Sequence, residues 1–193
     1  MGIALAFFLV GAVSCFPQEK GKNMDAAMKK WMEAATPGEG QKKLEVFAGR
    51  WEATSSVWVN GSEKPPAVSK GTAEVSWALG GRFLRQQTKG EMMGNPTEGI
   101  GYMGYDNVKK QYSMFWIDNS STAMYTAQGT FDTAGTTLTL YGTMDDPVTE
   151  EHGKQAKYVY RWIDANKYIF EFHDLSRKGS ETKVGEIVYT KVK

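Results

Sequence analysis

The clearest indication of the architecture of this chain is Val75–Asp118, VSWALGGRFLRQQTKGEMMGNPTEGIGYMGYDNVKKQYSMFWID. It contains four short apolar runs separated by three turns. Gly80-Gly81 end the first run, since glycine adopts a positive φ without steric cost, and Gly94-Asn95-Pro96 form the tip of the second turn. Asp106-Asn107 connect the third run to the fourth. Short turns between consecutive runs predict an antiparallel meander.

Runs of the same kind lie on both sides of this meander, at the spacing of an all-β barrel. The ten predicted strands are Trp51–Val59, Ser69–Ala78, Arg82–Thr88, Thr97–Tyr105, Gln111–Asp118, Ala123–Phe131, Thr136–Thr143, Ala156–Asp164, Tyr168–Asp174 and Lys183–Lys191. No segment between two of them is long enough for the helical crossover of a parallel sheet, so the sheet is predicted to be antiparallel. Closure into a barrel would leave no edge unpaired, and about ten strands leave room inside for one small ligand.

Several segments resemble the DUF1579 family of bacterial proteins, which are regarded as lipocalin-like. They are LGGRFL, KGEMMGNPTEGIGYMGYDN, FWID and GTFDTAGTTLTLYGTMDDP, and the similarity runs from about Thr36 to Lys191. Gly49-Arg50-Trp51 also resembles the Gly-x-Trp signature of lipocalins, in which the tryptophan closes one end of the barrel. The resemblance implies a closed or nearly closed antiparallel barrel of calycin type over residues 41–193. The family has no settled function, so the resemblance implies an architecture and not an activity.

The N-terminal residues have the form of an export signal. Met1–Ser14 are apolar and uncharged, and they are too short to span a bilayer. Ala12–Cys15 resembles a lipobox, in which the cysteine carries a lipid, and ordinary cleavage after Ser14 is the alternative. We therefore expect an exported protein that is periplasmic, anchored to the outer membrane as a lipoprotein, or secreted. Cys15 is the only cysteine, so an intrachain disulfide is excluded.

Residues 15–40 are expected to form a linker and an amphipathic helix at Asn23–Ala35, with Asn23 as its cap. Its apolar residues recur at helical spacing: Met24, Ala27, Met28, Trp31, Met32 and Ala35. The predicted strand Gln111–Asp118 is apolar on both faces, so something is expected to cover it from outside. We expect this helix to do so.

The charge balance argues against a polyanionic partner. The chain has 23 Lys and Arg against 22 Asp and Glu, for a net charge of +1, and the two signs are interspersed. Binding of nucleic acid or of an anionic membrane surface usually requires a basic patch, so neither is expected. Contact with a membrane is expected only through a lipid on Cys15. The remaining chain is predicted to be one domain, because nothing in it resembles an interdomain linker.

The hairpin near the C-terminus predicts which side chains face the barrel interior. We expect a three-residue loop, Ala165–Lys167. The resulting pairs are Trp162 with Phe170, Tyr160 with Phe172, and Arg161 with Glu171. Six aromatic residues then share one face and are expected inside: Tyr158, Tyr160, Trp162, Tyr168, Phe170 and Phe172. The outward set includes Lys157, Arg161, Glu171 and His173. A two-residue loop would mix the two sets and is disfavoured.

The predicted function is the binding of one small apolar or amphipathic molecule inside the barrel. The residues expected to contact it are Gln87, Trp116, Tyr125, Tyr158, Tyr160, Trp162, Phe170 and Tyr189. Aromatic rings that carry hydroxyl groups suit such a ligand. Packing of the same rings into a solid core is the alternative, because side chains alone can fill a small barrel. No cofactor and no metal are predicted.

No catalytic residue is predicted. The serines lack a Gly-x-Ser-x-Gly elbow, and the aspartates lie at strand ends and turns, where they usually bond to nearby backbone. Arg161 and Glu171 are expected to form an exposed ion pair, and His152 to lie in a solvated loop, Val148–Gln155. An enzyme acting on the ligand is an alternative function, which requires Arg161, Glu171 and His173 to face inward.

Two further hypotheses remain open at this point. Some ten-stranded barrels similar to this fold, such as the nitrobindins, bind haem through one histidine near the C-terminus. His173 would be that ligand if it faced the interior. An envelope protein with a filled barrel would instead use its surface, with the Met24–Ala35 helix or the Gly90–Pro96 loop as the contact region.

Overall fold

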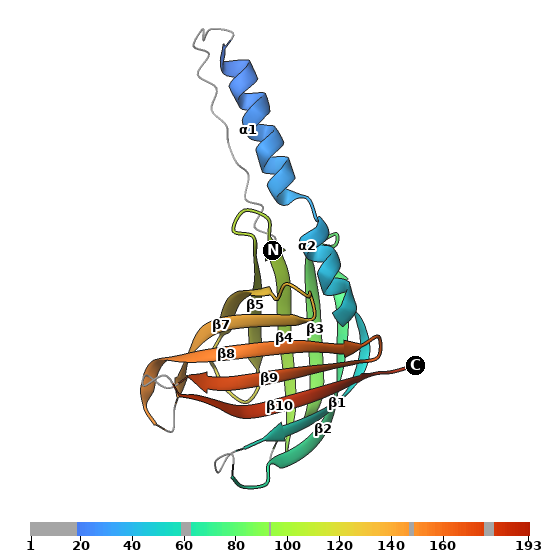
Figure 1. Ribbon diagram of the computed structural model, residues 1–193, viewed down its shortest axis with the longest axis vertical. Coiled ribbons are helices and arrows are strands. Elements are labelled where there is room, and N and C mark those ends of the chain that lie inside the picture. Colours follow the sequence, from blue (N-terminus) through green and yellow to red (C-terminus); the bar gives the residue numbers. More distant parts are fainter. Residues whose placement is uncertain (1–18, 59–62, 93, 147–148, 176–179) are drawn as a thin grey trace, which may run out of the picture. The chain divides into compact units, whose positions relative to one another are not determined.

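Ten antiparallel strands close into a barrel in the computed structural model of the chain, which describes residues 19–58, 63–92, 94–146, 149–175 and 180–193 (Figure 1). The strands are β1 (Gly49–Val57), β2 (Ala67–Ala78), β3 (Phe83–Met92), β4 (Asn95–Asp106), β5 (Gln111–Asp118), β6 (Tyr125–Phe131), β7 (Thr137–Asp146), β8 (Glu151–Asp164), β9 (Lys167–Leu175) and β10 (Glu181–Lys191). Each strand pairs with its neighbours in sequence, and the pairing of β1 with β10 closes the sheet. The predicted all-β antiparallel barrel of about ten strands is confirmed.

All ten predicted strands are present, and the differences lie at their ends. The largest difference is at β7 and β8, which extend to Asp146 and begin at Glu151. The backbone N–H of Gly153 donates to Asp145 Oδ1 at 2.8 Å, which ties the ends of these two strands together. His152 therefore lies in a strand, where it is exposed, and not in the predicted loop. The predicted end of the first strand at Val59 lies outside the described residues.

A hairpin replaces most of the predicted Gly90–Pro96 loop. β3 continues to Met92 and β4 begins at Asn95, so that most of the segment is paired sheet. Gly90 also faces Gly71 of β2, and a Cβ on Gly90 would lie 3.2 Å from the Cα of Gly71. The strands approach closely here because neither residue carries a side chain. A hairpin therefore forms this part of the surface, and its role as a contact region stays a prediction.

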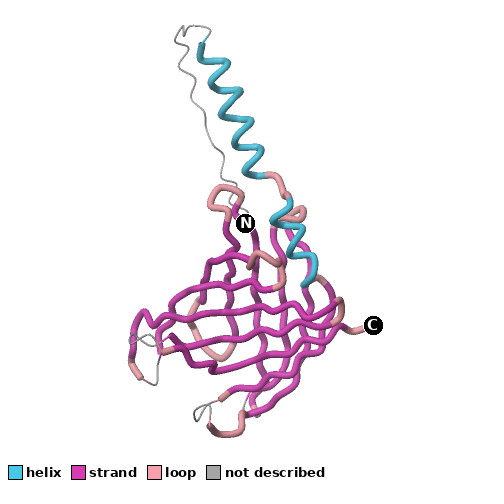
Figure 2. Tube along the Cα trace, viewed as in Figure 1, coloured by secondary structure: helices cyan, strands magenta, loops and turns pink. Residues whose placement is uncertain are grey.

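Two short helical segments, α2 (Glu39–Lys42) and the 3₁₀ helix η1 (Lys43–Phe47), lead into β1 at one end of the barrel (Figure 2). Trp51 is fully buried beneath them, and its Nε1 donates to the carbonyl oxygen of Phe47 at 2.9 Å. The Trp51 ring also meets Tyr168 edge to face, with 4.8 Å between the centroids. Trp51 thus closes this end, as the resemblance to the lipocalin signature implied.

The N-terminal helix α1 (Glu19–Ala35) forms a unit of its own, and the barrel unit spans Thr36–Lys193. The helix begins before Asn23, so Asn23 is not its cap as predicted. Glutamate and lysine, which precede Asn23 in the sequence, favour the helical conformation. The predicted apolar stripe is present, and its large side chains are exposed on the helix: Met24, Met28, Trp31 and Met32. Packing of α1 against the outer face of β5 stays a prediction.

Within the described ranges, no helix has the length and apolarity needed to cross a membrane. The predicted signal segment Met1–Ser14 and the predicted lipidation site Cys15 lie outside the described residues.

Glycine is required at Gly129 of β6, because the backbone of β7 passes close to it. A Cβ on Gly129 would lie 1.9 Å from the carbonyl oxygen of Thr139. We expect Gly129→Ala to lower the free energy of unfolding by at least about 2 kcal/mol, since β7 must move to make room. Denaturant unfolding followed by circular dichroism measures this change.

Gly38→Ala is the matched control, because nothing lies within 4 Å of a Cβ added at Gly38. We expect it to cost less than about 1 kcal/mol. Equal costs for the two substitutions would contradict the requirement for glycine at Gly129.

Candidate functional site

The β8–β9 hairpin sets the direction of the aromatic side chains. Its loop has two residues, Ala165-Asn166, and not the three predicted. A bulge at Ile163 then shifts the pairing by one residue. The observed pairs are Trp162 with Tyr168, Tyr160 with Phe170, and Tyr158 with Phe172. The predicted pairs are wrong, but the predicted faces are confirmed, because the bulge returns all six aromatic side chains to one side of the sheet.

Large side chains fill the half of the barrel next to η1. The buried members of this layer are Phe47, Trp51, Leu84, Tyr112, Leu138, Tyr160, Tyr168 and Tyr189. Trp162 completes it through edge-to-face contacts with Phe47, at 6.2 Å between centroids, and with Trp51, at 6.4 Å. Three predicted ligand contacts, Tyr160, Trp162 and Tyr189, therefore belong to a packed layer.

Small residues occupy many of the inward positions of the other half of the barrel. They are Ser55, Gly71, Thr88, Gly99, Gly101, Gly142, Ala156 and Gly185. Five inward aromatic side chains among them are only half-buried: Trp116, Tyr125, Tyr158, Phe170 and Phe172. The closed sheet shields an inward side chain from outside solvent, so its exposed surface faces the interior or the mouth. The structure brings four predicted ligand contacts together here: Trp116, Tyr125, Tyr158 and Phe170.

Two of these rings lie directly on the sheet at glycine positions. A Cβ on Gly99 would lie 2.2 Å from Trp116 Cζ2, and a Cβ on Gly185 would lie 2.3 Å from Phe172 Cε1. Trp116 Nε1 also donates to Asp118 Oδ2 at 2.8 Å. Contact with bare backbone and one hydrogen bond therefore hold the indole in place in the absence of any ligand.

The side chain of Gln86, and not that of Gln87, points into the barrel interior. Side chains of β3 alternate, with Leu84 and Gln86 inward, so Gln87 is exposed on the outer face. This geometry does not support the prediction that Gln87 contacts a ligand inside the barrel. Gln86 Nε2 donates to Tyr189 Oη at 3.3 Å. Burial raises the pKa of the Tyr189 phenol to about 12, so the hydroxyl is neutral at physiological pH.

Lys154, Asp146 and Asp174 form a charged cluster at the mouth of the barrel that the sequence analysis did not predict. Lys154 lies two residues before Ala156 and four before Tyr158, so it shares their face of β8 and points inward. Its Nζ lies 2.7 Å from Asp174 Oδ2 and 3.0 Å from Asp146 Oδ2. Hydrogen bonds to these two carboxylates raise the pKa of Lys154, which keeps the amine protonated. The alternation of β8 predicts the direction of Lys154, but only the pairing of β7, β8 and β9 brings the two aspartates to it.

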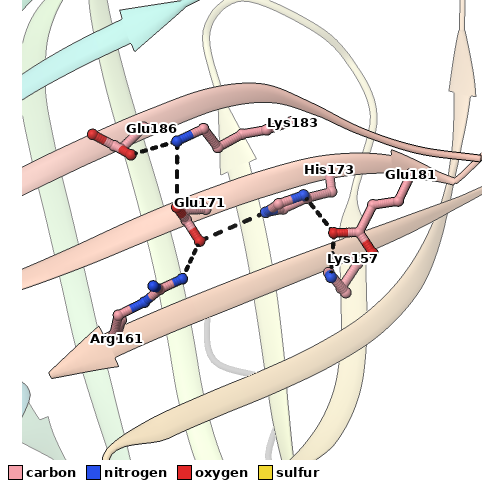
Figure 3. Close-up of polar contacts among 7 residues, drawn as sticks. All are labelled: Lys157, Arg161, Glu171, His173, Glu181, Lys183 and Glu186. Atoms are coloured by element: carbon pink, nitrogen blue, oxygen red, sulfur yellow. Dashed lines mark hydrogen bonds and ion pairs between the residues drawn. The ribbon is translucent and has the colours of Figure 1, made fainter.

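Arg161, Glu171 and His173 lie on the outer face, as predicted (Figure 3). Glu171 accepts a hydrogen bond from Arg161 Nη2 at 2.7 Å and lies 3.4 Å from Lys183 Nζ. The Glu171 side chain is only 11% exposed, in contrast to the exposed pair that was predicted. Arg161 and Glu171 are diagonal neighbours across the two strands and not direct partners, because Glu171 pairs with Val159. Long side chains of adjacent strands cover the carboxylate on the surface of the sheet.

His173 belongs to the same outer cluster. Its Nδ1 lies 2.8 Å from Glu181 Oε1, which is ion-pair distance without the alignment of a hydrogen bond. Glu181 also pairs with Lys157. His173 lies on the opposite face of β9 from Phe172, so its imidazole is not directed at the interior. The haem and enzyme hypotheses both required an inward His173, and this geometry does not support them.

Over the described part of the chain, no three His, Cys, Asp or Glu side chains are arranged to hold a metal ion.

Residues 36–191 match the family DUF1579, described as a protein of unknown function. Among solved structures, the crystal structure of Rv2717c from M. tuberculosis is similar at 14% identity and a TM-score of 0.58, covering 82% of this chain and 100% of that chain. A redesigned beta barrel, b11L5F_LGL, matches at 11% identity and a TM-score of 0.42, covering 81% of this chain and 100% of that one. At 14% identity, the likeness to the M. tuberculosis protein concerns the fold alone. A comparison with curated proteins gave no match.

The outer cluster leads to a prediction about stability. Glu171→Ala removes a nearly buried carboxylate and leaves Arg161 and Lys183 without their shared anion. We expect a loss of about 2 kcal/mol, below the cost of breaking a fully buried pair because Arg161 is half-exposed. Glu98→Ala, which breaks an exposed pair with Lys89, is the control and should cost less than about 1 kcal/mol. Denaturant unfolding of both variants tests this, and equal losses would contradict a stabilising role of the cluster.

Proposed function

Since the chain belongs to the DUF1579 family, whose function is unknown, we propose its function from the barrel itself: it binds one small apolar or amphipathic molecule in the half of the interior remote from η1. The observation that carries this proposal is the ring of small inward residues with half-buried aromatic side chains among them. A solid barrel core requires large side chains at such positions, because protein interiors are close-packed. Space lined by aromatic rings with a few polar groups suits a small ligand.

The distribution of polar groups supports an amphipathic ligand. Gln86 and the Tyr189 hydroxyl lie at the boundary with the packed half, while Lys154 and Asp174 lie at the mouth. Aromatic and small residues occupy the wall between them. A ligand with an apolar body therefore finds hydrogen-bonding groups at both ends of the site, which would fix its orientation.

We also propose that the protein works outside the cytoplasm, because Met1–Ser14 resemble an export signal and Cys15 ends a segment that resembles a lipobox. Native mass spectrometry of protein purified from the envelope of its own host tests both proposals at once. We expect a stoichiometric small-molecule adduct that is lost on denaturation, and a polypeptide that begins at or close to Cys15. Acyl chains on Cys15 would identify a lipoprotein, and their absence would indicate ordinary cleavage. A full-length polypeptide without an adduct would contradict both proposals.

A space-filling substitution distinguishes an open interior from a packed one. Ser55 points inward opposite Ile187 and lies further from Trp51, so Ser55→Phe places a ring in the proposed site. We expect the variant to bind the neutral dye N-phenyl-1-naphthylamine at least about tenfold more weakly, which corresponds to about 1.4 kcal/mol. Its free energy of unfolding should be unchanged or higher, because the new ring fills available space. Fluorescence titration and denaturant unfolding measure the two quantities.

Thr54→Phe is the matched control, because Thr54 is exposed on the outer face one residue away. It should leave dye binding unchanged. If Ser55→Phe instead destabilises the protein by about 1–3 kcal/mol, and the wild type does not bind the dye, the barrel is packed and the proposal fails.

A further inference from the structure

One wall of the interior, formed by β3, β4, β5 and β6, carries a fixed aromatic platform. The six-membered ring of Trp116 lies across two glycines of β4, since a Cβ on Gly99 would lie 2.2 Å from Cζ2 and a Cβ on Gly101 would lie 2.7 Å from Cε3. No other residue type fits beneath the ring without displacing it. The bond from Nε1 to Asp118 at 2.8 Å prevents the indole from turning. The ring thus packs on the backbone of β4, and its other side is available to the interior.

Neutral polar groups border this platform. Gln86 pairs with Gly101, which pairs with Trp116, so the carboxamide is the neighbour of the ring on one side. Tyr125 pairs with Trp116 on the other side, and its hydroxyl lies 3.3 Å from Ser121 Oγ. Thr88 lies beside Gly99, with Oγ1 only 3.0 Å from the position of a Cβ there. An amide and two hydroxyl groups therefore surround one flat ring.

Gln86 has hydrogen-bonding capacity beyond its contact with Tyr189. A carboxamide offers two N–H donors and an oxygen with two lone pairs, and the bond to Tyr189 Oη uses one donor. Gln86 is half-buried on the inward face, so the remaining groups can be reached from the interior. A wholly aliphatic ligand in this place would remove water from the carboxamide without replacing its hydrogen bonds, which is unfavourable.

The charged groups near the platform already have partners. Asp118 accepts from Trp116 Nε1 and from the backbone N–H of Ser120 at 2.9 Å. Lys154 is paired with Asp174 and Asp146 at the mouth. Gln86, Thr88 and Tyr125, which border the ring, are uncharged, and the Asp118 carboxylate bonded to its edge is anionic. The platform therefore favours a neutral ring over an anionic one.

We propose that the ligand of this barrel contains an uncharged planar aromatic ring with hydrogen-bonding groups on its edge, which stacks on Trp116 and is recognised by Gln86. This inference rests on the proposed function, which requires only that the interior binds a small molecule. It adds a chemical class, and it makes Gln86 the residue that determines specificity. Stacking supplies affinity for any flat ring, whereas the amide distinguishes rings with donors and acceptors from plain hydrocarbons.

The test compares two planar tricyclic probes. Lumichrome is planar and neutral, with carbonyl and N–H groups on its edge, and phenanthrene has no hydrogen-bonding group. Binding of each is measured by displacement of N-phenyl-1-naphthylamine, with 1-dodecanol as an aliphatic reference. We expect the wild type to bind lumichrome more tightly than phenanthrene. Gln86→Leu should weaken lumichrome binding by about tenfold and leave phenanthrene binding unchanged.

Two controls accompany this variant. Gln87→Leu makes the same change one residue away on the outer face and should alter neither affinity. Trp116→Leu removes the platform and should weaken both tricyclic probes by about tenfold, with little effect on 1-dodecanol. If Gln86→Leu does not fold, because Tyr189 loses its partner, Thr88→Val removes a neighbouring hydroxyl and should still weaken lumichrome selectively.

The outcomes separate this inference from the proposed function. If the wild type binds the dye and 1-dodecanol but has no preference for lumichrome over phenanthrene, the inference is overturned while the proposed function stands. Equal losses for both tricyclic probes in Gln86→Leu would overturn it as well. Binding of none of the four compounds to the wild type would overturn the proposed function itself.

Discussion

The pairing of β1 with β10 closes the sheet, and the arrangement of the whole barrel follows from it. It runs from Trp51 opposite Lys191 to Val57 opposite Gly185 and joins the first strand to the last. Because the sheet is closed, each side chain points either into a single interior or onto a single outer surface. Closure also requires neighbouring strands to approach closely where the sheet bends, and glycines such as Gly129 allow this.

Side-chain size then divides the interior along the barrel axis. Beside η1, Trp51 and Tyr168 pack edge to face and seal the end of the barrel. In the opposite half many of the inward residues are small, and Trp116 lies on glycine backbone at the wall. One half therefore supplies the close-packed contacts that stabilise the fold. The other half contributes fewer such contacts, and the proposed binding site lies there.

The outer surface of β8, β9 and β10 explains why ionisable residues near the C-terminus need not imply chemistry inside. Glu171 is nearly buried although it points away from the interior, because Arg161 and Lys183 extend across it from the neighbouring strands. His173 lies beside it among groups of both signs. These ion pairs connect three strands through their side chains, in addition to the hydrogen bonds of the sheet. The cluster is best understood as part of the barrel wall.

The ten strands, their antiparallel order and the inward face of the last hairpin could be predicted from the amino-acid sequence, because turn residues and the period-2 alternation of aromatic residues are local signals. The bulge at Ile163, the inward direction of Gln86 in place of Gln87, and the meeting of Lys154 with Asp174 could not. Each of these depends on how one strand pairs with another. Two adjacent glutamines are equivalent in sequence, and it is the pairing of β3 with β4 that places Gln86 beside Gly101 and Trp116.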